Sequence, residues 1–306
     1  MTLAVAGADV VDGLVAPRSL RRAILRRPAA LVAAIIVAAL CLAAAFAPLL
    51  VPYEAHQQLY FTEGTGVCQQ YAPSRAHIFG VDPLCRDTFS RFVNGARISL
   101  AIGIFTQAII IGIGMLIGGA AGLGPSWLDN LLMRFTDATY AFPDLLLIIL
   151  MASALRGTAL GDWAGGTFAI FLAIGIVGWV TIARLVRGEI LSLRTREFVI
   201  AAQALGATKP RIFLQHLLPN MIGPVIVAAT FGIPAAIFSE AALSYIGIGA
   251  RPPTPSWGVM VNEGYGVMLV SVWPVLFPAA GIAVTMLCFT LLGDALREVL
   301  DPRGAR

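Results

Sequence analysis

The stretch 98-ISLAIGIFTQAIIIGIGMLIGGAAG-122 contains no charged residue. A helix of this length rises about 38 Å, which is enough to cross the ~30 Å hydrocarbon core of a bilayer. Similar apolar runs recur along the chain of 306 residues, which is 58% hydrophobic and 12% charged. Soluble domains carry about a quarter charged residues. The sequence therefore predicts an integral membrane protein and leaves no room for a separate soluble domain.

Six apolar runs predict six transmembrane helices. They lie at Ala29–Val51, Ile98–Gly122, Phe135–Leu155, Thr167–Val186, Met221–Ile246 and Trp273–Gly293. The first run exceeds the roughly 7 to 15 apolar residues of a signal peptide, so we expect it to be retained. The runs lack the alternation of barrel strands, and lipid tolerates only helices or closed barrels. We expect an all-α integral membrane protein with one six-span transmembrane domain over residues 29–306.

The basic residues predict the orientation. With the N-terminus inside, fifteen of the 21 Lys and Arg residues fall on the inner side and six on the outer side. This asymmetry favours two cytoplasmic termini and an extracytoplasmic loop at 52–94. In the cytoplasmic segment 1–28, Arg18, Arg21 and Arg22 recur at helical spacing, followed by Arg26. They predict a basic amphipathic helix on membrane lipid; a disordered basic tail is the alternative.

A long cytoplasmic loop at 187–220 predicts a helix, a turn and a second helix. Residues Thr195–Leu205 suit a helix that Gly206 can end. Thr208 can cap a second helix, in whose first turn Pro210 is tolerated. The pattern is too long and too regular for a simple connector.

Small residues at this turn leave a bare surface that another protein could approach closely. The alternative is that they let the segment pack beneath its own spans. The segment resembles the cytoplasmic loop of permease subunits in bacterial binding-protein-dependent ABC importers, with the pattern Glu-Ala-Ala, three residues, Gly and a downstream Leu-Pro. The matching residues are Ala201, Ala202, Gly206, Leu218 and Pro219. Ile200 occupies the Glu position, and Glu197, one helical turn earlier, is the residue that can supply the charge.

Four further stretches resemble the shorter of the two paired permeases of dipeptide and oligopeptide importers. They are FGVDPLCRDTFSRFVNGARISLAIG from Phe79, RFTDATYAFPDLLL from Arg134, SEAALSYIGIGARPPTPSWGVMV from Ser239 and LLGDALREVLDPR from Leu291. The resemblance implies the fold of a type I ABC importer permease and a pore subunit that moves peptides into the cytoplasm. Relatives that import nickel chelates, glutathione or oligosaccharides leave the cargo open.

The resemblance also implies partners in the bacterial cytoplasmic (inner) membrane. These are a second permease that completes a heterodimer, two ATPase subunits that bind ATP and Mg, and an extracytoplasmic substrate-binding protein. The loop at 187–220 would place a coupling helix in a cleft of an ATPase. The single Lys, Lys209, precedes Pro210 and lies in no phosphate-binding G-x-x-x-x-G-K-[ST] string. We therefore expect no enzyme activity and no cofactor in this chain.

Other functions fit the sequence less well. The three His residues are too widely spaced for a zinc motif, and the Arg-rich composition gives no reason to expect a nucleic-acid partner. A self-sufficient secondary transporter is an alternative, but the halves show no internal repeat. A membrane scaffold would explain the long loop but not carboxylates inside the membrane.

Glu240 and Asp144 are our candidates for the translocation path. A carboxylate at a helix centre costs ~2.5 to 3.5 kcal/mol on insertion, so such groups usually face protein or a water-filled cavity. Pairing with donors at helix ends is the alternative. Pro143 and Pro234 can bend their spans, as gating elements or as static kinks. Gly114, Gly118 and Gly122 form a stripe for close packing or for a subunit interface.

Cys68 and Cys85 lie together in the loop at 52–94, on the expected oxidising side of the membrane. A disulfide between them would stabilise the loop by ~3 kcal/mol through the unfolded state. We predict this bond. The proline-rich stretch RPPTPSWG from Arg251 would be stiff enough to serve as a second docking element for a binding protein.

Overall fold

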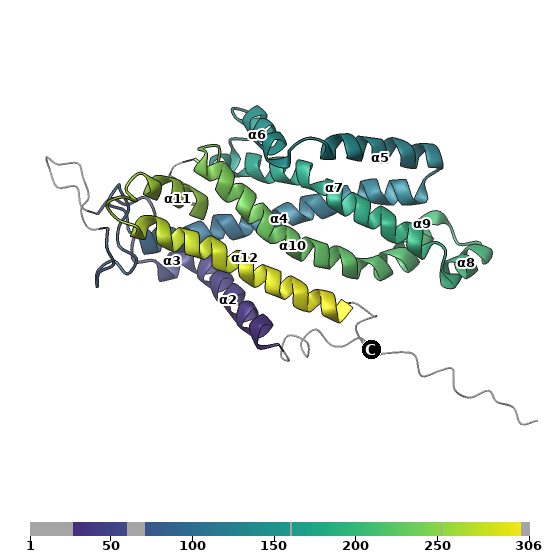
Figure 1. Cartoon of the computed structure of the whole chain (residues 1–306), viewed down its shortest axis with the longest axis horizontal. Coiled ribbons are helices and arrows are strands. Elements are labelled where there is room, and N and C mark those ends of the chain that lie inside the picture. The colour runs from purple at the N-terminus through teal and green to yellow at the C-terminus, as the bar shows by residue number, and fades with distance from the viewer. Residues whose placement is uncertain (1–26, 60–70, 160, 252, 301–306) are drawn as a thin grey trace, which may run out of the picture.

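The computed structural model describes residues 27–59, 71–159, 161–251 and 253–300. In Figure 1 the long helices run side by side along one axis, with α8 and α9 at one end of the bundle and α3 and α11 at the other. The α-helices are α2 (Pro28–Ala45), α3 (Ala47–Leu50), α4 (Thr88–Leu123), α5 (Ser126–Tyr140), α6 (Asp144–Leu155), α7 (Thr167–Leu193), α8 (Glu197–Ala204), α9 (Lys209–Ile212), α10 (Leu218–Tyr245), α11 (Trp257–Tyr265) and α12 (Trp273–Leu300).

Among the described residues, five helical stretches are long and apolar enough to cross a membrane. They are α2, α4, α7, the continuous stretch Lys209–Tyr245 and α12. The helices α5 and α6 together supply a sixth crossing if the bent pair counts as one span. The prediction of an all-α membrane protein is confirmed.

The centre of the bundle is the packing of α4 against α7. The carboxylate of Asp87 caps α4 by accepting a 2.7 Å hydrogen bond from the amide of Ser90. A Cβ at Gly118 would overlap the carbonyl oxygen of Ala183, and one at Gly122 would lie 2.8 Å from Ile190 Cγ2. The glycine stripe therefore packs within this chain and not at a subunit interface.

The third span differs from its prediction. We expected one helix over Phe135–Leu155, but α5 ends at Tyr140, α6 begins at Asp144, and the two axes differ by 91°. Pro143 lacks a backbone N–H, and its ring disfavours a helical conformation at Phe142, which favours a break here, whereas α10 continues through Pro224 and Pro234.

Two other boundaries differ from the prediction because helices extend beyond their apolar cores. The last turns of the predicted loop 52–94 already belong to α4, which begins at Thr88. The predicted loop 187–220 begins within α7 and ends within α10. Polar residues continue a helix where it leaves the bilayer, and hydropathy alone does not mark that point.

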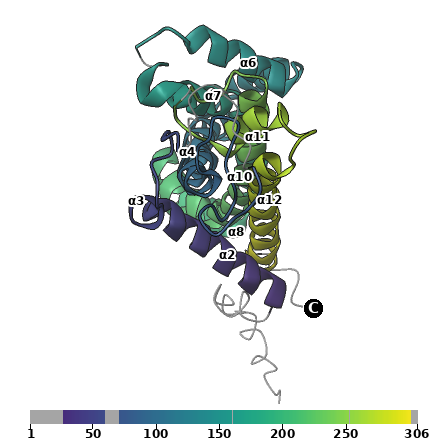
Figure 2. The ribbon, with the colours of Figure 1, turned by 90° about the vertical axis from the view of Figure 1, so that its left-hand side faces the viewer.

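The first and last spans cover one side of the bundle. Figure 2 shows α2 beside α12, with α6 on the opposite side of the molecule. Arg27, directly before α2, forms an ion pair with Glu298 near the end of α12. The predicted basic helix lies within 1–28, of which residues 1–26 are outside the described part of the chain. It stays a prediction.

The end of the bundle that carries α11 is held by buried charges. Arg86 donates to Asp82 and to Glu263 of α11, each at 2.7 Å, and Arg91 of α4 contacts both carboxylates. Arg86 and Arg91 are 5% and 1% exposed, so each charge needs these partners. His77 pairs with Asp87 at 2.9 Å in the same region. The segment 71–87 is thereby fixed to α4 and α11.

Candidate functional site

The helices α8 and α9 form the helix–turn–helix that the sequence predicts. Gly206 follows α8 with φ of +80°, a left-handed conformation that only glycine adopts without strain. The amide of Ala207 donates to the carbonyl of Ala202, which closes the turn. Thr208 is the N-cap residue directly before α9 and has an extended backbone, but its side chain makes no capping hydrogen bond, which differs from our expectation.

The turn presents both polar and apolar groups to the outside of the molecule. Ala201, Gly206 and Glu197 are exposed, as are Ile200 and Leu205, the latter by 89%. Ala202 is 9% exposed and lies, with the fully buried Val199, on the face toward the bundle. The small residues therefore differ in burial. Ala202 packs beneath its own spans, while Ala201 and Gly206 face outward.

Leu218 and Pro219 lie where the second helix runs into the fifth span. Residues Phe213–Leu217 form a π-helical turn, and α10 starts directly after them at Leu218. Pro219 has no amide hydrogen to donate, and such a gap accompanies a shifted hydrogen-bond register. Leu218 packs against the buried cluster of α7 and α10, so this joint belongs to the bundle.

Two arginines of α7 fasten α5 near the α8 end. Arg187 binds Asp129 through two hydrogen bonds of 2.5 and 2.7 Å. Arg184 donates to Asp137 at 2.7 Å and lies 4.4 Å from the ring centroid of Tyr140. Tyr140 is the last residue of α5 before the break that precedes Asp144. Sequence reasoning missed these pairs, because partners 58 and 47 residues apart leave no local pattern.

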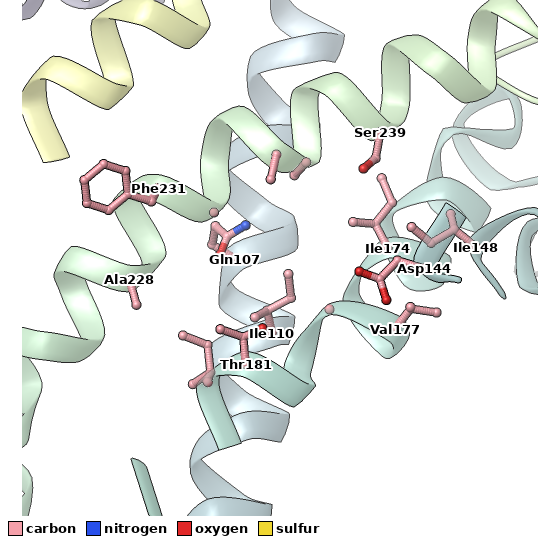
Figure 3. Close-up of a pocket in the computed structure, with 15 residues that line it drawn as sticks. Gln107, Ile110, Asp144, Ile148, Ile174, Val177, Thr181, Ala228, Phe231 and Ser239 are labelled. Carbon is pink, nitrogen blue, oxygen red and sulfur yellow. The ribbon is translucent and has the colours of Figure 1, made fainter. Parts of the chain in front are cut away.

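A cavity of about 330 Å³ opens between α4, α6, α7 and α10, and Asp144 lines it (Figure 3). The rest of its wall is apolar or uncharged. Its polar members are Gln107, Thr181 and Ser239. The prediction that Asp144 faces an open space fits this geometry. Gln107, 5% exposed, was not predicted, since one amide within an apolar run gives no signal for its surroundings.

Glu240 lies elsewhere on α10 and does not line that cavity. It is fully buried, and it accepts hydrogen bonds from Ser244 at 2.7 Å and from Ser99 of α4 at 3.1 Å. Ser99 also accepts from the amide of Trp257 at 3.2 Å. The carboxylate thus joins α10, α4 and the start of α11, which matches the alternative of pairing with nearby donors.

The predicted disulfide joins a described and an undescribed residue. Cys85 is 6% exposed and lies in the turn beside Asp82 and Arg86, with φ of +60°. Cys68 lies outside the described residues, so the Cys68–Cys85 bond stays a prediction. Cys41 and Cys288, on α2 and α12, are free.

Comparisons with known proteins agree with this architecture. Residues 98–306 match the family of binding-protein-dependent transport system inner membrane components, and residues 18–64 match the N-terminal transmembrane domain of oligopeptide transport permease C. An inward-facing structure of the MetNI methionine ABC transporter superposes with a TM-score of 0.57 at 18% identity, covering 70% of this chain and 97% of that one. That likeness concerns the fold.

Curated relatives extend over most of the chain. The oligopeptide transport system permease protein of Bacillus subtilis is 38% identical, over 90% of this chain and 85% of its own length. The dipeptide transport system permease protein of the same organism is 42% identical, over 78% and 72%. The glutathione transport system permease protein of Escherichia coli is 39% identical, over 91% and 88%. This chain therefore belongs to the family of binding-protein-dependent transport system inner membrane components.

Proposed function

We propose that this chain is a pore-forming permease subunit of an ATP-driven importer that moves peptides across a bacterial inner membrane. The observation that carries the proposal is the exposed helix–turn–helix of α8 and α9, fixed to the end of a membrane bundle of this family. An element that projects from the bundle and has small, exposed residues at its turn suits docking to another subunit. The chain itself performs no covalent chemistry in this proposal.

In this account α8 is the coupling helix. Ala201 and Gly206 give a partner ATPase close access to the turn, Glu197 supplies the negative charge, and the flanking Ile200 and Leu205 are apolar contacts. Ala202 and Leu218 hold the element to the bundle, and Pro219 lies at the joint with α10. Closure of the ATPase pair would push α8, and α7 would carry the displacement, since only residues 194–196 separate the two helices.

The cavity beside Asp144 is the proposed segment of the translocation path within this chain. It is bordered by four different helices, including α6 of the broken α5–α6 pair, so a relative movement of these helices changes its access. Glu240 has a supporting role in this account, because its buried hydrogen bonds anchor α11 to α4 and α10.

The assembly comprises this chain, a second permease, two ATPases that bind ATP and Mg, and an extracytoplasmic binding protein. Both termini and the α8 end lie in the cytoplasm, as the arginine distribution favours. The segment 71–87 and α11 then face the outside, where the binding protein delivers its cargo. Their buried ion pairs make this end a firm platform for docking.

Uptake by the reconstituted complex tests the proposal. The complex is purified with its partners and reconstituted into proteoliposomes. It should accumulate a labelled dipeptide only when ATP is present on the side of the ATPase subunits and the binding protein is present on the opposite side. Glutathione, itself a tripeptide, serves as the competing cargo because one relative carries that name. Accumulation by this chain alone, without ATP, would overturn the proposal in favour of a secondary transporter.

A further inference from the structure

The cavity between α4, α6, α7 and α10 contains a single charged group. Fifteen residues line it, and Asp144 is the only one of them with an acidic or basic side chain. No described residue forms an ion pair with Asp144. Asp144 is exposed and lies in the first turn of α6, so a cation in the cavity can reach its carboxylate while both groups stay partly solvated.

The basic residues on neighbouring elements are engaged elsewhere. On α7, Arg184 binds Asp137 and Arg187 binds Asp129. Arg156, directly after α6, donates to the carbonyl of Gly247. On α4, Arg91 belongs to the buried network with Asp82, and the exposed Arg97 lines a different pocket. Asp144 is thus available to pair with a cationic group of a molecule bound in the cavity.

A second polar group in the same cavity also lacks a partner. Gln107 is 5% exposed, and its Nε2 has no hydrogen-bond partner among the described residues. A buried donor without an acceptor is unfavourable by about 1–3 kcal/mol, so few remain in folded proteins. Figure 3 shows Gln107 and Asp144 extending into the cavity from α4 and α6. The amide can donate to a carbonyl oxygen there.

We propose that Asp144 and Gln107 form a cargo-recognition subsite, in which the carboxylate binds a cationic amino group and the amide donates to a carbonyl oxygen. Both groups occur in one peptide, and the apolar wall formed by residues such as Ile110, Ile148 and Phe231 accommodates its side chain. The subsite rests on the proposed function and adds a charge preference to it. The translocation path favours cationic over neutral peptides.

The test compares two peptides that differ by one charge, Ala-Lys and Ala-Lys acetylated on the side-chain nitrogen. The complete complex takes up each from saturating, preformed binding-protein complexes in proteoliposomes. The readout is the ratio of the two ATP-dependent uptake rates, which is compared between variants. Because every variant receives the same loaded binding protein, the preference of that protein cancels from the comparison.

We expect Asp144→Asn to lower the cationic-to-neutral ratio about two- to fivefold, the range for a partly solvated ion pair. Asp144→Glu keeps the charge and should restore the ratio. The matched control is Asp294→Asn, which removes an exposed carboxylate of α12 that does not line the cavity. Gln107→Leu should slow both peptides to a similar extent, since both contain the carbonyl.

An unchanged ratio in Asp144→Asn, with both peptides still imported, would overturn the subsite and leave the proposed function intact. Failure of the wild-type complex to import either peptide would overturn the proposed function and the subsite with it. A ratio that falls equally in Asp294→Asn would assign the effect to net charge and also overturn the subsite.

Discussion

Gly118 and Gly112 lie on the same helix and meet different surroundings. A Cβ at Gly118 would overlap the backbone of α7, whereas nothing lies within 4 Å of one at Gly112. We expect Gly118→Leu to force α4 and α7 apart and to destabilise the fold by about 1–3 kcal/mol. The midpoint of thermal unfolding in detergent should fall for Gly118→Leu and stay within error for Gly112→Leu. Equal midpoints would contradict the packing described for α4.

Arg91 and Arg97 make a second matched pair on α4. Arg91 is buried against Asp82 and Glu263, whereas Arg97 is exposed. Arg91→Met leaves two carboxylates to share Arg86, and breaking a buried pair typically destabilises by about 3–5 kcal/mol. Limited proteolysis should then cleave the segment 71–87 much faster than in Arg97→Met. Similar cleavage rates would show that the ion network does not hold this segment.

For single residues, the sequence predicted the kind of environment better than it predicted which other residues make contact there. The spacing of Gly114, Gly118 and Gly122 predicted a close helix approach, yet α7 as the partner required the tertiary structure. Glu240 was singled out by its charge inside a span, but of the two serines that donate to it, Ser244 lies on the same helix and Ser99 lies on α4, 141 residues away. Hydropathy describes one chain segment at a time, so it does not show which side chains of separate segments come into contact.

At the scale of elements, the ion pairs between α5 and α7 connect the helix that precedes α8 with the broken span. Arg187→Met removes two hydrogen bonds to Asp129 that are partly exposed, worth about 1 kcal/mol. We expect ATP hydrolysis by the complex to persist while peptide uptake per ATP falls several-fold, because α5 no longer follows α7. Paired uptake and hydrolysis assays in proteoliposomes measure this ratio.

The double variant Asp129→Arg with Arg187→Asp restores an ion pair in which the two charges have changed places. It should recover part of the uptake. An unchanged ratio of uptake to hydrolysis in Arg187→Met would contradict a mechanical role for this contact. Arg134→Met is the control, since Arg134 is exposed on α5 and forms no ion pair among the described residues.

The elements themselves were largely predictable. Continuous apolar runs located the spans, and Gly206 and Pro210 located the turn and the second helix of the α8–α9 element. The break at Pro143 was expected only as a bend, because an apolar run continues through it and hides the 91° change of direction. Whether a proline kinks a helix or ends it depends on the neighbours that take up the freed backbone groups.

At the scale of the whole molecule, the proposed topology places the two ends of the bundle on opposite sides of the membrane. Leu205, in the α8–α9 turn, is 89% exposed, and Ile78, in the segment fixed to α11, is 62% exposed. A membrane-impermeant maleimide applied to intact cells should label Ile78→Cys and not Leu205→Cys. Inside-out vesicles should reverse the pattern. Labelling of both positions, or of Leu205→Cys alone, in intact cells would contradict the orientation.

The central claim is that the α8–α9 turn docks the ATPases, and co-purification tests it most directly. The tagged chain is isolated from its native membrane as wild type, as Gly206→Arg and as the control Gly188→Arg. Both glycines have open space around a Cβ, but Gly206 alone lies at the turn with positive φ. We predict that mass spectrometry finds ATPase subunits with the wild type and with Gly188→Arg, but not with Gly206→Arg, while the second permease accompanies all three. Retention of the ATPases by Gly206→Arg, or their absence from the wild type, would contradict the account.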